Sequence, residues 1–397
     1  MLKLNESSWS LEDFKAAHDC IDSDQHTMGP KVAQFEIDFA KYVGAKHAVM
    51  VNSGSSANLL GVSALKYLHP PRVNRNTVIV PALSWSTTYY PWIQNGYRLR
   101  FVDIDPLTFN IDLNAMEEAI DSTVVGICVP HILGADAGIT QIMKIANDFG
   151  LWVFEDTCES LGATPLSNSQ NKLGTFGLIG TYSFFRSHHI STMEGGMLVT
   201  NSNDMFELAL SKRAHGWGRN VPKNGLLKVE QTESWESKFK FYVDGYNLRP
   251  LEISGAIGIS QLTQIESFIQ RRRENANFLR GFLLGNSSFQ VQEQSETGSW
   301  MAFGITSRTT KFSRADIVLQ LESAGIETRP IVTGNFLRQP VIKQIQGLID
   351  VKGDYSGANY VHDNGIMFAN HGRNLKNELG AVSAILQRID SEENTHI

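Results

Sequence analysis

The sequence predicts an α/β protein with a large, mostly parallel β-sheet and a smaller C-terminal region of mixed helices and strands. From about residue 30, short apolar runs alternate with amphipathic stretches. This alternation is typical of parallel sheets that carry helices on both faces. Beyond about residue 175, neighbouring strands and a long helix replace it. The chain has 397 residues, 42% of them hydrophobic, which suits two or three domains with a sizeable core.

The first half of the chain supplies the alternating elements. Residues 32–43 are predicted to be a helix because Phe35, Phe39 and Val43 recur at four-residue spacing. Further helices are expected at 57–67, 113–120 and 141–149, and strands at 48–52, 78–81, 98–104, 124–129 and 151–155.

The second half is expected to begin with two adjacent strands, at 182–185 and 196–200, joined by a polar loop. A long helix at 255–273 leads into a region with a strand at 302–305 and helices at 314–324 and 379–389. We place a domain boundary inside the long helix. Residues 1–265 would form an N-terminal segment and a large domain, and residues 266–397 a small C-terminal domain.

Charge and hydropathy exclude several classes of partner. The net charge is −6, from 35 Lys and Arg against 41 Asp and Glu, so neither nucleic acid nor an anionic membrane is expected as a partner. Charged residues interrupt every long apolar stretch, which argues against a membrane-spanning helix. No secretory signal is recognisable near Met1, and the cytoplasm is therefore the expected compartment.

The three cysteines are Cys20, Cys128 and Cys158. They are far apart and odd in number, so they predict neither a disulfide framework nor a C-x-x-C metal site. They also fall one short of an all-cysteine iron–sulfur site.

Three features of the first half could bind a ligand. Gly54, Ser55 and Ser56 lie between a strand and a helix start, where backbone N–H groups and the helix dipole favour a phosphate; a helix N-cap is the plainer interpretation. Asp156 follows a strand at the carboxyl edge of the sheet, and could hold a protonated ring nitrogen or cap a loop. Trp85 could stack on a flat ring or simply pack.

His188 and His189 are adjacent in a polar, glycine-containing loop. No HExxH spacing or carboxylate pair supports a metal site there. A histidine with a near-neutral pKa is a natural proton shuttle, and an ordinary hydrogen-bonded loop histidine is the alternative.

Together these segments resemble the DegT/DnrJ/EryC1 sugar aminotransferase family of the fold-type-I, vitamin-B6-dependent enzymes. The resemblance covers nearly the whole chain and implies an aspartate-aminotransferase-like fold. It is carried by these stretches: Thr27-Met28-Gly29, the Gly54-Ser55-Ser56 loop, 85–91, Glu155-Asp156, Ser-His-His-Ile at 187–190, Met-Glu-Gly-Gly at 193–196, 213–217, 245–252 and 329–336.

The resemblance also implies residue roles. For the cofactor, it implies that Gly54, Ser55, Ser56 and Ser183 bind the phosphate, together with Asn247 from a neighbouring subunit, that Asp156 pairs with the ring nitrogen, and that Trp85 and Glu159 lie along the ring. For the amino-acid donor and the sugar substrate, it implies Ser187, His215, Arg219, Arg249 and Arg329. No metal site is implied.

His188 departs from the family pattern. Five residues after Ser183, family members carry the lysine that bonds covalently to the cofactor, and no lysine occurs between Lys172 and Lys212. Histidine at this position resembles the 3-dehydratases of dideoxysugar pathways. That resemblance implies non-covalent pyridoxal and pyridoxamine phosphate, L-glutamate as amino donor, no iron–sulfur cluster and a homodimer. The implied substrate is a nucleotide-linked 4-keto-6-deoxy sugar, GDP-4-keto-6-deoxy-D-mannose, which loses its C3 hydroxyl on the route to colitose and lipopolysaccharide O-antigen while ammonia is released.

Three alternatives remain open at this stage. A 4-aminotransferase acting on the same sugar would need the missing lysine. A CDP-4-keto-6-deoxyglucose 3-dehydratase that depends on an iron–sulfur cluster would need four clustered cysteines. A non-catalytic, cofactor-binding regulator would have no reason to keep Asp156, the phosphate loop and the paired histidines.

Overall fold

The computed structural model describes residues 1–167, 170–229 and 235–394. An eight-stranded sheet forms its centre, in the order β1-β7-β6-β5-β4-β2-β3-β11. The strands are β1 His47–Val51, β2 Thr77–Pro81, β3 Arg98–Val102, β4 Val124–Pro130, β5 Trp152–Asp156, β6 Ile179–Ser183, β7 Gly196–Thr200 and β11 Ile349–Val351. β7 runs opposite to the other seven strands of this sheet, which are parallel to one another, and this confirms the predicted mostly parallel sheet.

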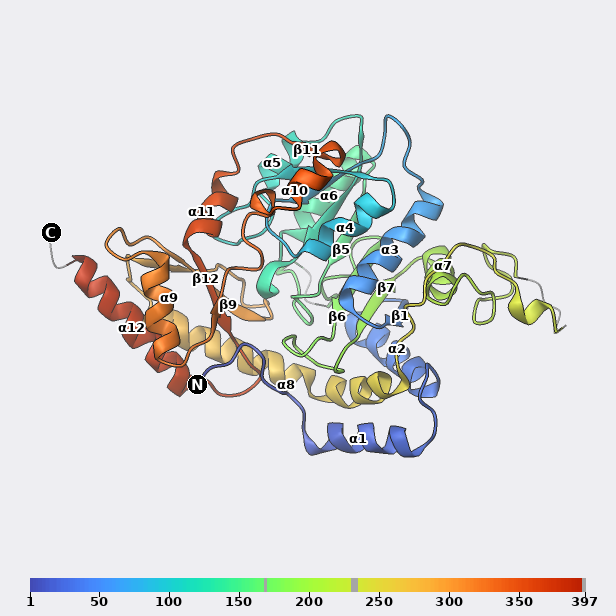
Figure 1. Cartoon of the computed structure of the whole chain (residues 1–397), viewed down its shortest axis with the longest axis horizontal. Coiled ribbons are helices and arrows are strands. Elements are labelled where there is room, and N and C mark those ends of the chain that lie inside the picture. Colours follow the sequence, from blue (N-terminus) through green and yellow to red (C-terminus); the bar gives the residue numbers. More distant parts are fainter. Residues whose placement is uncertain (168–169, 230–234, 395–397) are drawn as a thin grey trace.

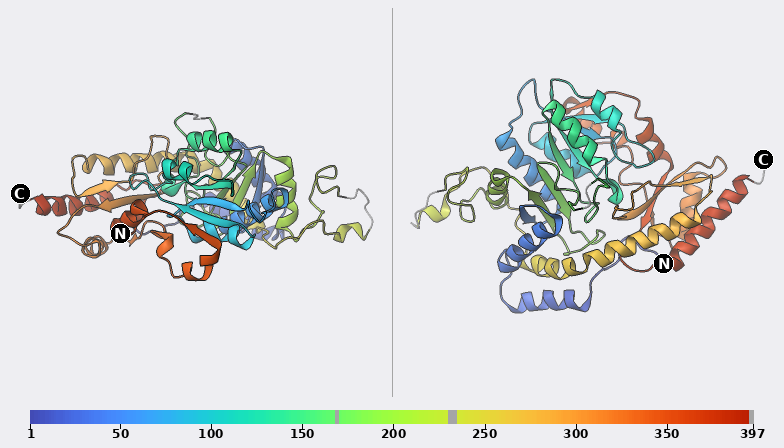
Figure 2. Two further views of the ribbon diagram at one scale, coloured as in Figure 1. Left: turned by 90° about the horizontal axis from the view of Figure 1, so that it is seen from above. Right: turned by 180° about the vertical axis from the view of Figure 1, so that it is seen from behind.

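Helices cover both faces of this sheet (Figures 1 and 2). Successive residues of β2 show why: Val78 and Val80 join the apolar cluster that contains α3, α4 and α7, whereas Ile79 joins the cluster of α5 and α6. A third apolar cluster packs α2 and α8 against β1, β6 and β7. These helices are α2 Pro30–Val43, α3 Gly54–Leu68, α4 Ser86–Gln94, α5 Leu113–Glu118, α6 Ile139–Phe149, α7 Asn203–Arg213 and α8 Glu252–Phe282.

The C-terminal part builds a four-stranded antiparallel sheet of order β10-β12-β9-β8. Its strands are β8 Phe289–Val291, β9 Ala302–Ser307, β10 Thr328–Arg329 and β12 Gly365–Ala369, and its helices include α9 Arg314–Ser323, α11 Ser356–Asn364 and α12 Lys376–Asn394. Helix α8 runs beneath both sheets, with α1 (Leu11–Asp22) alongside it (Figure 1). No helix in the described ranges has the length and apolar character needed to cross a membrane.

One predicted strand was misplaced. Residues 182–185 were expected to be extended, but β6 ends at Ser183. Phe184 continues the apolar run because it is fully buried outside the strand, where its ring packs against Phe35 and Phe39 of α2. The apolar pattern therefore extended past the strand end, and the segment that carries His188 begins earlier than predicted.

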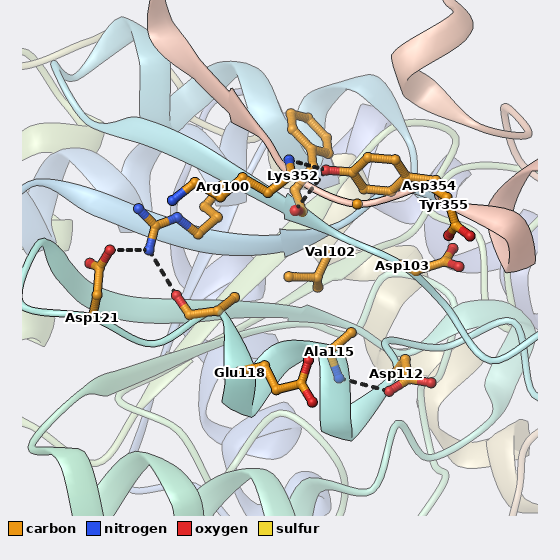
Figure 3. Close-up of a pocket in the computed structure, with 13 residues that line it drawn as sticks. Arg100, Val102, Asp103, Asp112, Ala115, Glu118, Asp121, Lys352, Asp354 and Tyr355 are labelled. Atoms are coloured by element: carbon orange, nitrogen blue, oxygen red, sulfur yellow. Dashed lines mark hydrogen bonds and ion pairs between the residues drawn. The ribbon is translucent and has the colours of Figure 1, made fainter.

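Arg100 ties the C-terminal part back to the large sheet. Its guanidinium, on β3, is buried and pairs at 2.8 Å with both Asp121 and Asp350, and Asp350 belongs to β11. Figure 3 shows the pair with Asp121. A hollow of about 490 Å³ lies beside this cluster. The division of the chain near residue 265 stays a prediction. Strand β11 is an exception to it, because β11 follows residue 265 in the sequence but belongs to the eight-stranded sheet.

Candidate active site

A cavity of about 340 Å³ opens at the carboxyl edge of the large sheet. Strands β4, β5 and β6 run parallel, and β1 is parallel to β6 because both pair antiparallel with β7. The segments that follow these strands therefore meet at one edge, where open α/β sheets bind ligands.

The structure brings most of the predicted site residues together at this cavity. The predicted residues that line it are Gly54, Ser55, Trp85, Asp156, Glu159, Ser183, Ser187, His188 and Arg329. Five others do not line it in this chain: Ser56, His215, Arg219, Asn247 and Arg249.

The loop at the start of α3 combines an N-cap with a second, exposed hydroxyl, Ser55, whose Oγ lies 2.9 Å from Thr87 Oγ1. Ser53 is the N-cap, since its Oγ accepts from Ser56 N at 3.1 Å. Ser55, which the cap does not use, is exposed at the cavity. Gly54 lets the start of α3 lie close to Ser183 and Cys158, since a Cβ at this position would lie 2.6 Å from Cβ of Ser183 and 2.9 Å from Sγ of Cys158. The loop can therefore present backbone N–H groups and hydroxyls to an anion.

Asp156 is the last residue of β5 and is only 7% exposed. Its Oδ2 accepts hydrogen bonds from Asn58 Nδ2 at 2.9 Å and from Thr88 Oγ1 at 2.8 Å. The loop-cap contact is also present, since Cys158 N donates to Oδ1 at 3.3 Å. The carboxylate is thus fixed at the cavity wall and can accept one further donor from the cavity.

Trp85 is the N-cap residue of α4, and 55% of its side chain is exposed. A tryptophan that only filled the core would be covered. Its exposed face on the cavity wall offers a surface on which a flat ring can stack.

His188 lines the cavity and is partly buried. Burial lowers its pKa to about 4, and the neighbouring Arg272 guanidinium acts in the same direction. Ser187 Oγ lies 3.4 Å from its Nδ1. At neutral pH the imidazole is therefore uncharged and can accept a proton.

His189 has a different role. It is 1% exposed, and its Nε2 lies 3.2 Å from the carbonyl oxygen of Ser299, which can only accept, so His189 donates this bond. Burial, followed by Arg272, lowers its pKa well below the usual value. Among the described residues, no group of three or more His, Cys, Asp or Glu side chains could hold a metal ion. Of the two adjacent histidines, His188 therefore faces the cavity, whereas His189 is buried and bonded to the backbone.

Glu159 accepts a hydrogen bond from Leu133 N at 2.8 Å. Burial nevertheless raises its pKa to about 7. Its charge can therefore change near neutral pH, within the same cavity as His188.

Sequence reasoning missed several residues of this cavity. Asn58, Thr88, His131, Cys158 and Glu194 also line it. Thr88 lies on the first turn of α4, within the stretch 85–91 that carries the resemblance, and Asn58 lies on α3, two residues after the Gly54-Ser55-Ser56 loop. Neither residue type marks a site by itself. Their signal is spatial, because both contact Asp156.

Apart from Ser56 on α3, the predicted residues outside the cavity belong to the segment between α7 and α8. Part of that segment extends from one end of the molecule (Figure 2). Asn247 and Arg249 are exposed and bond to each other at 3.0 Å. Arg219 lies over the ring of Trp217 at 5.6 Å, and His215 packs against the same ring.

Comparison with known proteins adds one curated relative and two solved structures. GDP-4-keto-6-deoxy-D-mannose 3-dehydratase of Yersinia pseudotuberculosis is 42% identical over 390 residues, which cover 97% of this chain and 98% of that protein. Two crystal structures of GDP-4-keto-6-deoxymannose-3-dehydratase match with a TM-score of 0.92 and 41% identity, over 97% of this chain and 100% of each of theirs. One is an H188N mutant with bound GDP-perosamine, and the other holds a trapped PLP-glutamate geminal diamine.

The model of the DegT/DnrJ/EryC1/StrS aminotransferase family matches residues 8–371. That match covers most of the chain, including every strand of the large sheet and every residue that lines the cavity. This chain belongs to the DegT/DnrJ/EryC1/StrS aminotransferase family.

Proposed function

We propose that this protein is a pyridoxamine-phosphate-dependent 3-dehydratase of a nucleotide-linked 4-keto-6-deoxy sugar, with GDP-4-keto-6-deoxy-D-mannose as substrate. The observation that carries the proposal is an uncharged histidine, His188, at the position where the family binds its cofactor through lysine. The relatives that match the whole chain are named as enzymes of this activity.

The cavity fits pyridoxal or pyridoxamine phosphate. The start of α3, with Ser55 and Ser183 beside Gly54, would hold the phosphate. The backbone N–H of Ser56 is already bound to Ser53, so Ser56 would reach the phosphate through its hydroxyl. Asp156 would hold the ring nitrogen, with Trp85 and Glu159 along the ring.

The overall reaction balances with glutamate as the reductant. Glutamate is oxidised to 2-oxoglutarate, the C3–O bond of the sugar breaks, C3 gains a hydrogen, and nitrogen leaves as ammonia. One water departs with the hydroxyl and one is consumed when the nitrogen is released. Pyridoxamine phosphate, when bound, supplies an amine that can join the C4 carbonyl and a ring that can store electrons.

His188 moves the protons. Because its pKa is lowered to about 4, its imidazole is a free base at neutral pH and can take a proton from the carbon that bears the cofactor amine. The resulting imidazolium can deliver that proton to the departing C3 hydroxyl. Unlike lysine, it forms no stable covalent bond to the cofactor, so the cofactor is held by the surrounding contacts.

The remaining predicted residues are assigned to the substrates and to a homodimer. Ser187 and Arg329 line the cavity and are proposed to contact the donor carboxylate and the sugar. Asn247 is proposed to reach the phosphate from the neighbouring subunit. His215, Arg219 and Arg249, which belong to the same segment between α7 and α8, are proposed to contact the substrates. We place the homodimeric enzyme in the cytoplasm.

The substrate is tested with a panel of nucleotide sugars. The protein is incubated with pyridoxal phosphate, glutamate and the GDP-, CDP- and dTDP-linked 4-keto-6-deoxy sugars, and the products are analysed by mass spectrometry. The GDP sugar of mannose configuration is expected to lose its C3 oxygen. Preference for a CDP sugar, with dependence on bound iron and a reductase, would instead establish the iron–sulfur alternative.

A further inference from the structure

The first turn of α4 contacts three parts of the proposed cofactor site. Trp85 is its N-cap, Thr87 Oγ1 lies 2.9 Å from Ser55 Oγ, and Thr88 Oγ1 lies 2.8 Å from Asp156 Oδ2. A single helical turn therefore connects the residues assigned to the ring face, the phosphate and the ring nitrogen.

The direction of the Thr88 hydrogen bond follows from its partners. A carboxylate only accepts, so the Thr88 hydroxyl donates to Asp156. Ser84 Oγ lies 2.9 Å from Thr88 Oγ1, and it must donate because the Thr88 proton is already used. Ser84 and Thr88 are 3% and 2% exposed, so water does not compete for these bonds.

Asn58 supplies the second donor. Thr181 Oγ1 donates to Asn58 Oδ1 at 2.6 Å, which orients the amide so that Nδ2 faces Oδ2 of Asp156 at 2.9 Å. Nδ2 also donates to the carbonyl oxygen of Thr87 at 3.2 Å. That carbonyl lacks its usual helical donor because Pro91, four residues later, has no N–H.

The two oxygens of Asp156 are therefore unequally occupied. Oδ2 accepts from two buried side chains at 2.9 and 2.8 Å, whereas Oδ1 accepts a longer bond, at 3.3 Å, from the backbone N–H of Cys158. The Cys158 thiol, which burial keeps protonated, also bonds to this carboxylate. Asp156 lines the cavity, so Oδ1 is the oxygen with acceptor capacity left for a ligand.

We propose that Thr88 and Asn58 are positioning residues that hold Oδ2 of Asp156 and thereby present Oδ1 to the ring nitrogen of the cofactor. The inference rests on the proposed function, since it requires the vitamin-B6 cofactor in this cavity. Neither residue touches the reacting atoms, and both act through Asp156.

The test measures equilibrium binding of two ligands to the cofactor-free protein by fluorescence titration. One ligand is pyridoxal phosphate, and the other is its carbocyclic analogue, in which C–H replaces the ring nitrogen. Thr88→Val keeps the side-chain shape but removes the donor. It is expected to weaken pyridoxal phosphate binding roughly 10-fold and to leave binding of the analogue unchanged.

Three further variants make this result decisive. Thr88→Ala, which also lacks the hydroxyl, is expected to show the same selective loss if Thr88→Val folds poorly. Thr88→Ser keeps the donor and is expected to bind within roughly 3-fold of the parent. Thr306→Val is the matched control, because it removes a buried hydroxyl on β9 that has no hydrogen-bond partner among the described residues.

Equal weakening of both ligands would show that the hydroxyl is only structural and would overturn the proposal, as would no weakening of either. A parent protein that binds pyridoxal phosphate but turns over no sugar leaves this proposal standing and removes the proposed function. A parent that does not bind pyridoxal phosphate overturns both.

Discussion

The guanidinium of Arg272 donates a hydrogen bond to the main-chain carbonyl of His188 at 3.4 Å. Arg272 lies on α8, is 3% exposed, and donates its other bonds to the carbonyl oxygens of Met301 and Asn370. No carboxylate among the described residues forms an ion pair with it, and burial lowers its pKa to about 9. A buried positive charge thus lies beside the imidazole that we propose as the base.

This relationship predicts the pH dependence of turnover. A histidine is active as a base when it is unprotonated, so kcat/KM should fall on the acid side with a midpoint near the lowered pKa of about 4, not near 6.5. Arg272→Gln removes the charge and should move that midpoint upward by roughly one pH unit. Measured kcat/KM profiles from pH 3 to 8 check this, and an unchanged midpoint in Arg272→Gln would show that Arg272 does not act on His188.

His188→Lys should change cofactor binding from non-covalent to covalent. The lysine amine can bond to the cofactor aldehyde, so the absorption spectrum should gain the band of covalently bound cofactor, and dehydration should fall at least roughly 100-fold. His188→Gln is the control, because it should lose dehydration without gaining the band. Dehydration by His188→Lys at the parent rate would refute the assignment of His188.

Glu159 predicts a pH-dependent stability of the cofactor-free protein. Its folded-state pKa is raised from 4.5 to about 7, so its protonated form favours the folded state below pH 4.5, and that contribution is lost as the pH rises through 7. Glu159→Gln stays neutral and should be about 3 kcal/mol more stable than the parent at pH 8, and similar at pH 4. Urea unfolding at both values checks this, with Glu117→Gln on the surface of α5 as the control. An equal difference at both values would exclude titration as its cause.

The start of α3 has no room for a side chain at Gly54. A methyl group there would lie 2.6 Å from Cβ of Ser183, so Gly54→Ala must shift either the start of α3 or the end of β6. We expect a loss of about 1–3 kcal/mol in the free energy of unfolding and weaker binding of pyridoxal phosphate. Gly281→Ala, in α8 with no atom near the added methyl group, should instead be neutral or stabilising by up to about 1 kcal/mol. Urea unfolding measures both, and an unchanged Gly54→Ala would contradict the proposed crowding.

Much of the large sheet could be predicted because its strands are apolar runs separated by amphipathic helices. The same pattern led to a wrong prediction at Phe184. A strand was predicted there, but the apolar run continues into the core after β6 has ended. It also could not show that Ile349–Val351 pairs with β3, since only the folded chain places Asp350 beside Arg100. A three-residue edge strand carries too little pattern to be recognised.

The candidate site divides in the same way. Ser55, Asp156 and His188 could be named because each occupies a recognisable place in a family motif, and the structure brings them to one cavity. Asn58 and Thr88 could not, because their importance lies in two hydrogen bonds to Asp156 across elements distant in the chain. The roles of Asn247, Arg249, His215 and Arg219 stay predictions, since these residues lie away from the cavity of their own chain.

The central claim is that a histidine at position 188 makes the donor nitrogen leave the sugar. The most direct measurement follows that nitrogen from isotopically labelled glutamate, with pyridoxal phosphate and GDP-4-keto-6-deoxy-D-mannose, by nuclear magnetic resonance and mass spectrometry. We predict that the label appears in free ammonia and that the sugar product is one oxygen atom lighter and contains no nitrogen. Label retained on C4 of a sugar that still carries its C3 hydroxyl would contradict the account.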